Sequence, residues 1–153
     1  HDALPICNAC CAGYVVSEEQ SLDKILHIFL LTIVLYMLVS VPVEPKILSS
    51  NGNIEDFTSA SHDLVIGDKL ETLEGSTVYI RCPATGNPPP VIEWKKSGAA
   101  VTMSSNLQIV NNTLVLLDGK LSDNGKYTCV ASNGAGSDER ETILSFKGAF
   151  QQL

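Results

Sequence analysis

The sequence predicts an all-β fold in which two sheets form a sandwich, preceded by a single hydrophobic helix. From about residue 62, short stretches alternate between polar and apolar side chains and are separated by Gly, Pro and Asn. Turns every 8–12 residues indicate about seven or eight short strands, which is typical of a two-sheet sandwich. In contrast, residues 25–43 carry no charged side chain and are long enough for a membrane-spanning helix.

Composition divides the 153-residue chain into five parts. Residues 1–24 form a Cys-containing N-terminal segment, and residues 25–43 form the hydrophobic segment. Residues 44–61 are rich in Ser, Asn and Gly and lack a hydrophobic period, so we expect a linker there. The sandwich domain should occupy residues 62–147, followed by a tail at 148–153.

The first clear strand of the domain is "STVYIRC". Because side chains alternate between the two faces of a strand, Val78, Ile80 and Cys82 should share one face. Tyr79 and Arg81 should share the other. The next stretch, "PATGNPPP", should not be regular strand, because proline supplies no N–H group to a ladder.

The later strands follow the same pattern. "VIEWKK" places Trp94 on one face and Glu93 and Lys95 on the other. "NLQIV" and "TLVLL" flank Asn111-Asn112, which we expect to form a hairpin turn because Asn tolerates positive φ. "GKYTCVAS" and "ETILSF", joined by a tight turn at "NGAG", complete the set.

The order and spacing of three residues then indicate a family. Trp94 follows Cys82 by 12 residues and precedes Cys129 by 35. Tyr127 stands two residues before Cys129 in "DNGKYTC". With "LEGSTVYIRC", "GNPPPVIEW" and "CVASNGAG", these residues resemble an immunoglobulin domain of the intermediate (I-set) type over roughly residues 64–147. The resemblance implies a disulfide between Cys82 and Cys129, with Trp94 packed on it and Tyr127 buried as a tyrosine corner.

One position departs from the family pattern. Gly119 stands four residues before Asp123, where a buried aliphatic side chain is usual in the family. We expect Leu117 or Leu121 to turn inward and fill the space.

Composition argues against several classes of function. A net charge of −7 disfavours binding to nucleic acid, whose phosphates select basic surfaces, and to anionic lipid head groups. None of His1, His27 and His62 stands near a second ligand type at metal-binding spacing. No catalytic triad, phosphate loop or dinucleotide fingerprint is present, and Glu139 and Glu141 belong to an exposed strand. We therefore expect neither an enzyme nor a cofactor.

Two sequence motifs suggest modification or pairing. The motif "CNACC" contains Cys7, Cys10 and Cys11 and has three interpretations. It resembles half of a zinc site, or it offers lipidation sites if this segment is cytosolic. We favour the third interpretation, in which these cysteines belong to a truncated upstream module. The chain opens at His1 rather than Met, so we expect part of a longer or processed protein. Asn111-Asn112-Thr113 is an N-glycosylation sequon on a predicted turn.

The apolar segment 25–43 has four interpretations. As a helix its 19 residues extend about 28 Å, close to the hydrocarbon core of a bilayer, so a retained membrane anchor fits best. A cleaved signal, whose apolar part is usually shorter, would be cut near Ser40 and Pro42. A core helix has no place in a sandwich, and a non-native extension would have no membrane role. One lysine flanks the segment on each side, Lys24 before it and Lys46 after it, so the charges do not indicate its orientation in a membrane. A disulfide requires an oxidising compartment, and this places the domain outside the cytosol.

We therefore expect a non-catalytic extracellular module for recognition or adhesion, anchored in the cell membrane. It would bind a protein partner, homophilic or heterophilic, through its sheet faces or end loops. Tyr79, Arg81, Glu93 and Lys95 are the candidate contact residues, chosen by strand parity. Two alternatives stay open: a spacer domain of a secreted extracellular-matrix protein, and a cytosolic muscle-type domain whose two core cysteines stay reduced.

Overall fold

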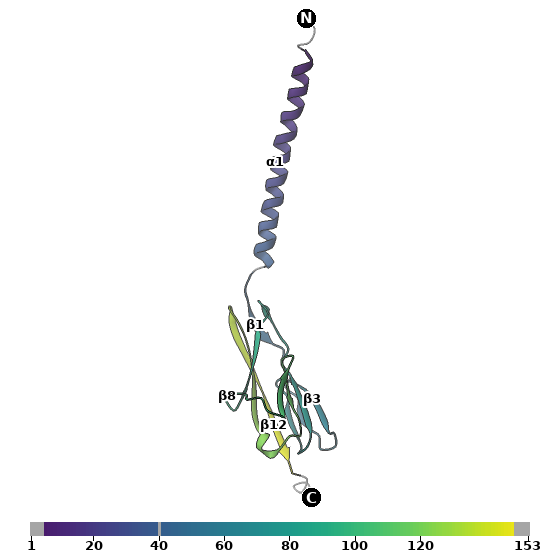
Figure 1. Cartoon of the computed structure of the whole chain (residues 1–153), viewed down its shortest axis with the longest axis vertical. Coiled ribbons are helices and arrows are strands. Elements are labelled where there is room, and N and C mark those ends of the chain that lie inside the picture. Colours follow the sequence, from purple (N-terminus) through teal and green to yellow (C-terminus); the bar gives the residue numbers. More distant parts are fainter. Residues whose placement is uncertain (1–4, 40, 149–153) are drawn as a thin grey trace. The chain divides into compact units, whose positions relative to one another are not determined.

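The computed structural model describes residues 5–39 and 41–148, with side chains from residue 21 onward. The chain divides into two compact units, His1–Val41 and Pro42–Leu153. The first unit is a single helix, α1 (Pro5–Val39), and the second is a β-sandwich (Figure 1).

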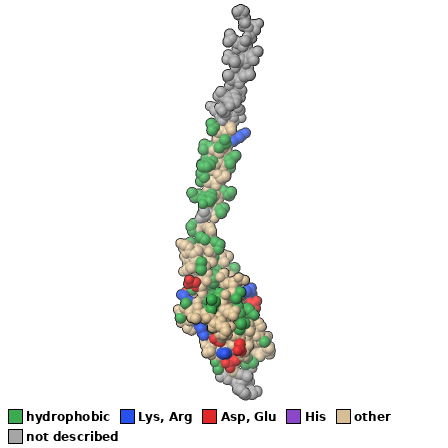
Figure 2. All heavy atoms as spheres, in the orientation of Figure 1, with side chains coloured by type: hydrophobic (Ala, Val, Ile, Leu, Met, Phe, Trp, Pro, Cys, Tyr) green, Lys and Arg blue, Asp and Glu red, His purple; other side chains and the backbone are tan. Residues whose placement is uncertain are grey.

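Hydrophobic side chains cover the described part of α1 (Figure 2). Within the described residues, Ser21–Val39 is one helical stretch long and apolar enough to cross a membrane, and none of it is buried. A signal sequence near an N-terminus meets the same criteria of length and composition. The helix ends at Val39, not at residue 43 as expected, because Pro42 cannot continue a helix and Val43 begins a strand. The side chains of Cys7, Cys10 and Cys11 lie outside the described residues.

The second unit contains a four-stranded sheet in the order β3-β5-β10-β9 and a six-stranded sheet in the order β2-β4-β12-β11-β7-β8. A separate two-stranded ladder joins β1 to β6. The strands are β1 (Val43–Ile47), β2 (Asn53–Glu55), β3 (Ser61–Val65), β4 (Lys69–Leu73), β5 (Thr77–Arg81), β6 (Ala84–Asn87), β7 (Val91–Lys96), β8 (Ala99–Ala100), β9 (Leu107–Val110), β10 (Thr113–Leu116), β11 (Gly125–Asn133) and β12 (Gly136–Lys147), with a 3-10 turn η1 (Leu121–Asp123). The predicted fold class, an all-β sandwich preceded by an apolar helix, is confirmed.

The predicted strand parity is also correct. Val78 and Ile80 on β5 are 0% and 1% exposed, whereas Tyr79 between them is 39% exposed. Asn111 and Asn112 form the turn between β9 and β10, with φ of 48° and 64°. These positive φ values are the conformation for which Asn was expected at this turn.

Residues 44–61, expected to be a linker, instead form part of the sandwich. β1 pairs antiparallel with β6, and β2 pairs parallel with β4. Ile47 is only 2% exposed, and its N–H donates to Asp138 Oδ2 at 2.8 Å. The domain therefore begins at Val43 rather than at residue 62. β1 has five residues and only two buried positions, so its alternating pattern is too short to be recognised in the sequence.

The stretch "PATGNPPP" also differs from expectation, because residues 84–87 form β6. Its prolines flank the strand and leave the N–H groups of residues 84–87 available to β1.

Asp68 connects the loop between β1 and β2 to the end of β3 by hydrogen bonds. Its Oδ1 accepts the N–H of Gly52 at 2.9 Å, and its Oδ2 accepts the N–H of Val65 at 3.1 Å. The neighbouring Gly67 has a φ of 103°, and a Cβ there would lie 1.8 Å from the carbonyl oxygen of Ser50. Only glycine therefore permits the chain to pass so close to the loop between β1 and β2.

The space left by Gly119 is filled by Phe146 and not by Leu117 or Leu121. A Cβ at Gly119 would lie 2.3 Å from the Phe146 ring, and Phe146 is only 1% exposed. Leu121 is 46% exposed, and Leu117 is half-buried. The expectation was wrong because the aromatic ring enters from β12, a strand remote in sequence.

Asn133 ties β1 to the turn between β11 and β12. Its Nδ2 donates to the carbonyl oxygens of Val43 at 2.8 Å and Pro88 at 2.9 Å. Its Oδ1 accepts the N–H groups of Ala135 and Gly136 at 2.8 and 3.2 Å. The amide thus connects three segments that are distant in sequence.

Replacing Asn133 by Asp is expected to destabilise the domain by about 1–2 kcal/mol, because a carboxylate cannot donate to these two carbonyl oxygens. Urea unfolding of the variant measures this loss. Asn51→Asp, at an exposed position, is the matched control and should leave the midpoint nearly unchanged. Equal midpoints for Asn133→Asp and the parent protein would contradict the role given to this side chain.

Candidate functional site

A disulfide-centred core holds the two sheets together. Cys82 and Cys129 are bonded across a sequence separation of 47, with their Cα atoms 6.5 Å apart. Trp94 on β7 is the cross-strand neighbour of Cys129 on β11 and is only 3% exposed. Its Nε1 donates to the carbonyl oxygen of Asn112 at 3.1 Å, so the polar edge of the buried indole is satisfied.

Tyr127 completes this core as a tyrosine corner. Its side chain is 0% exposed, and its hydroxyl donates to the carbonyl oxygen of Asp123 at 2.7 Å. Burial, and secondarily the Asp123 carboxylate, raises the pKa of the Tyr127 phenol well above its ordinary value. The phenol therefore remains a protonated hydrogen-bond donor. Cys82, Cys129, Trp94 and Tyr127 are all buried in the core between the two sheets.

The outer face of β7, β11 and β12 is the strongest candidate for contact with another molecule. Thr128 on β11 has Lys95 of β7 and Glu141 of β12 as its cross-strand neighbours. Val130, one row further, lies between Glu93 and Glu139. In the strand lettering of immunoglobulin domains, β7 is strand C, β11 is strand F and β12 is strand G, so we call their solvent-facing side the FGC face. It is defined by Glu93, Lys95, Lys126, Thr128, Val130, Glu139 and Glu141.

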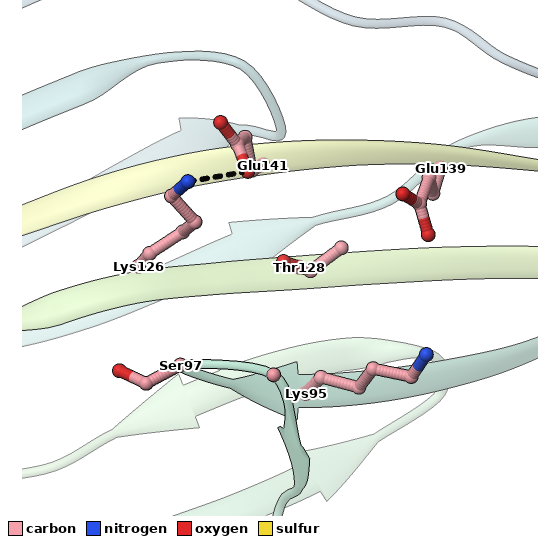
Figure 3. A pocket seen from close by; sticks show the side chains of 7 residues that line it. Lys95, Ser97, Lys126, Thr128, Glu139 and Glu141 are labelled. Carbon is pink, nitrogen blue, oxygen red and sulfur yellow. Dashed lines mark ion pairs between the residues drawn. The ribbon is translucent and has the colours of Figure 1, made fainter.

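A shallow open hollow of about 530 Å³ lies on the FGC face. Thr128 lies between Lys95 on one side and Glu139 and Glu141 on the other (Figure 3). Lys126 Nζ contacts Glu141 Oε2 at 3.2 Å, while none of the salt bridges between described residues involves Lys95 or Glu139. Charged groups of both signs therefore remain available to a partner.

The four residues predicted as contacts do not form one surface. Glu93 and Lys95 belong to the FGC face, whereas Tyr79 and Arg81 lie on the outer side of β5, in the other sheet. Arg81 is occupied there by Asp63, whose Oδ1 lies 2.9 Å from its Nε. Strand parity correctly separated inward from outward positions but did not assign the strands to sheets.

Lys126, Thr128 and Val130 were missed as members of the FGC face. Their signal was present in the sequence, because they alternate with the inward-facing Tyr127 and Cys129. Strand parity did not predict the neighbours of β11, because these are given only by the order of strands in the sheet.

Metal-ligand geometry and the placement of His62 are two further features of the described residues. No group of three His, Cys, Asp or Glu side chains among the described residues is arranged to hold a metal ion. His62 is buried, with its Nε2 2.9 Å from Thr72 Oγ1, and its Nδ1 lies 3.8 Å from Asp56 Oδ2. This histidine is enclosed beneath the loop between β2 and β3, away from the FGC face.

A two-sheet sandwich with a bridging disulfide, a buried Trp and a tyrosine corner defines an immunoglobulin-like domain. The Immunoglobulin I-set domain model matches residues 64–146. The chain belongs to the immunoglobulin I-set family, as the sequence resemblance indicated.

Known proteins with similar sequences and structures agree with this assignment. Hemicentin-1 of Homo sapiens is 40% identical over 79 residues, which are 50% of this chain and 1% of that protein. The basement membrane-specific heparan sulfate proteoglycan core protein of Mus musculus is 42% identical over 74 residues, 48% of this chain and 2% of that protein. A structure described as the structural basis for Dscam isoform specificity matches with a TM-score of 0.53 and 27% identity, covering 69% of this chain and 25% of that one. The chain therefore spans only a small share of these relatives.

Proposed function

We propose that this chain is a non-catalytic, extracellular recognition module that is anchored to the cell membrane by α1 and binds a protein partner through the FGC face. The observation that carries the proposal is the combination, in one chain, of a disulfide-bridged I-set sandwich and the apolar stretch Ser21–Val39. The disulfide favours an oxidising compartment, which would leave residues 1–24 on the cytosolic side.

Fractionation of cells that express the full chain tests the anchor. Retention in the membrane pellet after carbonate extraction supports an anchored protein. Recovery of the domain from the medium, without the first forty or so residues, would instead support a cleaved signal. Five reactive thiols under denaturing, non-reducing conditions would contradict an extracellular domain, because Cys82 and Cys129 would then be reduced.

A secreted spacer domain is the second candidate. It is favoured by the similarity to a protein whose name places it in basement membrane. Release into the medium, followed by binding of the domain to deposited matrix rather than to cells, would support this alternative over the anchored form.

The sequon predicts a glycan on Asn111. Asn111 lies exposed on the turn between β9 and β10, as an acceptor site requires. Thr113→Val should abolish the shift in gel mobility that a glycosidase produces, because it removes the sequon without changing the turn residues. Thr113→Ser, which preserves the sequon, is the matched control and should retain the shift. A glycosidase-insensitive parent protein would contradict the prediction.

Charge reversal on the FGC face should weaken partner binding. Lys95→Glu places an acidic group beside Glu139 and Glu141, and loss of about one to two kcal/mol of binding free energy is expected if Lys95 meets an acid on the partner. Aggregation of expressing cells with one another, or with untransfected cells, measures homophilic and heterophilic binding respectively. Arg81→Glu, the same reversal on the opposite sheet, is the control. Equal loss from both variants would argue against the FGC face.

A further inference from the structure

We propose that the end of the sandwich where β1 begins lies against the lipid bilayer, so that partners reach only the sheet faces and the opposite end. This inference rests on the proposed function, because it needs α1 as a retained anchor. Its physical basis is the replacement of the expected 18-residue linker by strands of the domain itself.

Loops from several parts of the chain meet at this end. Val43, the first residue of β1, pairs with Asn87 at the end of β6. Asn133 binds the carbonyl oxygens of both Val43 and Pro88. The loop between β6 and β7 and the turn between β11 and β12 therefore lie beside the start of β1.

The side chains exposed here form an apolar rim. Val43 at the start of β1 is 52% exposed, and Val91 at the start of β7 is 65% exposed. Pro88 and Pro89 are also exposed. We call these four residues, Val43, Pro88, Pro89 and Val91, the apolar rim. Glu44 is the charged side chain next to Val43, so a zwitterionic lipid surface suits the rim better than an anionic one.

The segment between α1 and β1, which we call the tether, is short and therefore determines what covers the rim. Only residues 40–42 separate the last residue of α1 from the first residue of β1. Four residue steps span at most about 14 Å, even when fully extended. With α1 in the bilayer and Val39 near the edge of the hydrocarbon region, the start of β1 stays within the head-group layer or directly above it.

The opposite end of the domain is distant from the rim. β12 runs from Gly136, beside Asn133, to Lys147 at the other end. At about 3.3 Å per residue, the distance along β12 from Ser137 to Phe146 is roughly 30 Å. Phe146 lies beside η1, since its backbone N–H and carbonyl both bond to the side chain of Asn124. Leu121 in η1 therefore marks the end of the sandwich opposite the rim.

Val91 of the rim and the sequon belong to different sheets. Val91 belongs to the six-stranded sheet, whereas Asn111 follows β9 in the four-stranded sheet. A glycan on Asn111 can thus extend into water beside the membrane while the apolar rim contacts lipid.

Photo-crosslinking of the full chain in phosphatidylcholine nanodiscs tests this arrangement. Three proteins each carry p-benzoylphenylalanine at one exposed position: Tyr36 in α1, Val91 in the rim, or Leu121 at the opposite end. Attachment to an alkyne-bearing phosphatidylcholine is read out after purification. We expect crosslinks at Tyr36 and Val91 and none at Leu121. Val91 and Leu121 are matched, because both are exposed apolar residues of the same domain.

A tether variant completes the test. About twelve Gly and Ser residues inserted between Val41 and Pro42 add a mean span of roughly 20 Å. The Val91 crosslink should then be lost while the Tyr36 crosslink remains. A Tyr36 crosslink without one at Val91 in the parent chain would overturn the inference but leave the anchor intact. Absence of the Tyr36 crosslink would overturn the anchor and this inference together, and equal crosslinking of Val91 and Leu121 would overturn the inference alone.

Discussion

Replacing Cys82 and Cys129 together by Ala is expected to lower the melting temperature by well over 10 °C. The bond closes a chain segment with a sequence separation of 47, and cross-linking a loop of this size restricts the unfolded chain by about 4 kcal/mol. A domain of this size is stable by only about 5–15 kcal/mol. The disulfide thus contributes a large share of the free energy of unfolding. Since each kcal/mol shifts the melting temperature by roughly 4–8 °C, loss of the bond should lower that temperature by well over 10 °C.

Thermal unfolding under oxidising and reducing conditions provides the control. The parent protein should lose most of the same increment when its disulfide is reduced, whereas the double Ala variant should melt at one temperature in both conditions. A variant that melts with the oxidised parent would contradict the stabilising role of the bridge. It would also weaken the argument that the domain folds in an oxidising compartment.

Replacing Gly119 by Ala is expected to destabilise the domain by about 3 kcal/mol, an unusually large effect for one added methyl group. The new Cβ would lie 2.3 Å from the ring of Phe146, which is only 1% exposed, and the cores of folded proteins are generally close-packed. Chemical denaturation of the variant measures the loss. Gly134→Ala is the matched control, because nothing lies within 4 Å of a Cβ there, and it should be nearly neutral.

A double-mutant cycle shows whether Phe146 causes the effect. Phe146→Leu alone should destabilise the domain by leaving a cavity. Combined with Gly119→Ala, it should cost at least about 1 kcal/mol less than the sum of the two single changes, because the smaller side chain leaves room for the new methyl group. Strict additivity would show that the added Cβ meets some other obstacle.

The family and the core could be predicted from the sequence because their determinants are local or regularly spaced. Strand parity correctly placed Val78 and Ile80 on one face, since alternation is a property of any extended strand, and the family resemblance correctly implied that Tyr127 and Cys129 are buried. The turn at Asn111-Asn112 could be predicted for a similar reason, because Asn tolerates the positive φ that a two-residue hairpin turn needs. The membrane-compatible stretch was visible from composition alone.

The boundary of the domain was not predictable in the same way. β1 and β2 are short, and their pairing partners β6 and β4 lie further along the chain. A strand is stabilised by hydrogen bonds to its neighbour, so a weakly patterned segment becomes a strand only when that neighbour is in place. The tertiary structure therefore converted the expected linker into part of the fold and shortened the tether to α1 to three residues.

The sequence by itself determined that this chain is an I-set immunoglobulin domain with an apolar segment before it, because the Cys82–Trp94–Cys129 spacing and the apolar run depend only on residue order. The tertiary structure alone decided which outward residues share a surface. Glu93 and Lys95 join Thr128 and Glu139 on the FGC face, while Tyr79 and Arg81 lie on the other sheet. The physical reason is that parity fixes the side of a strand on which a residue lies, whereas sheet membership is set by long-range hydrogen bonding between strands.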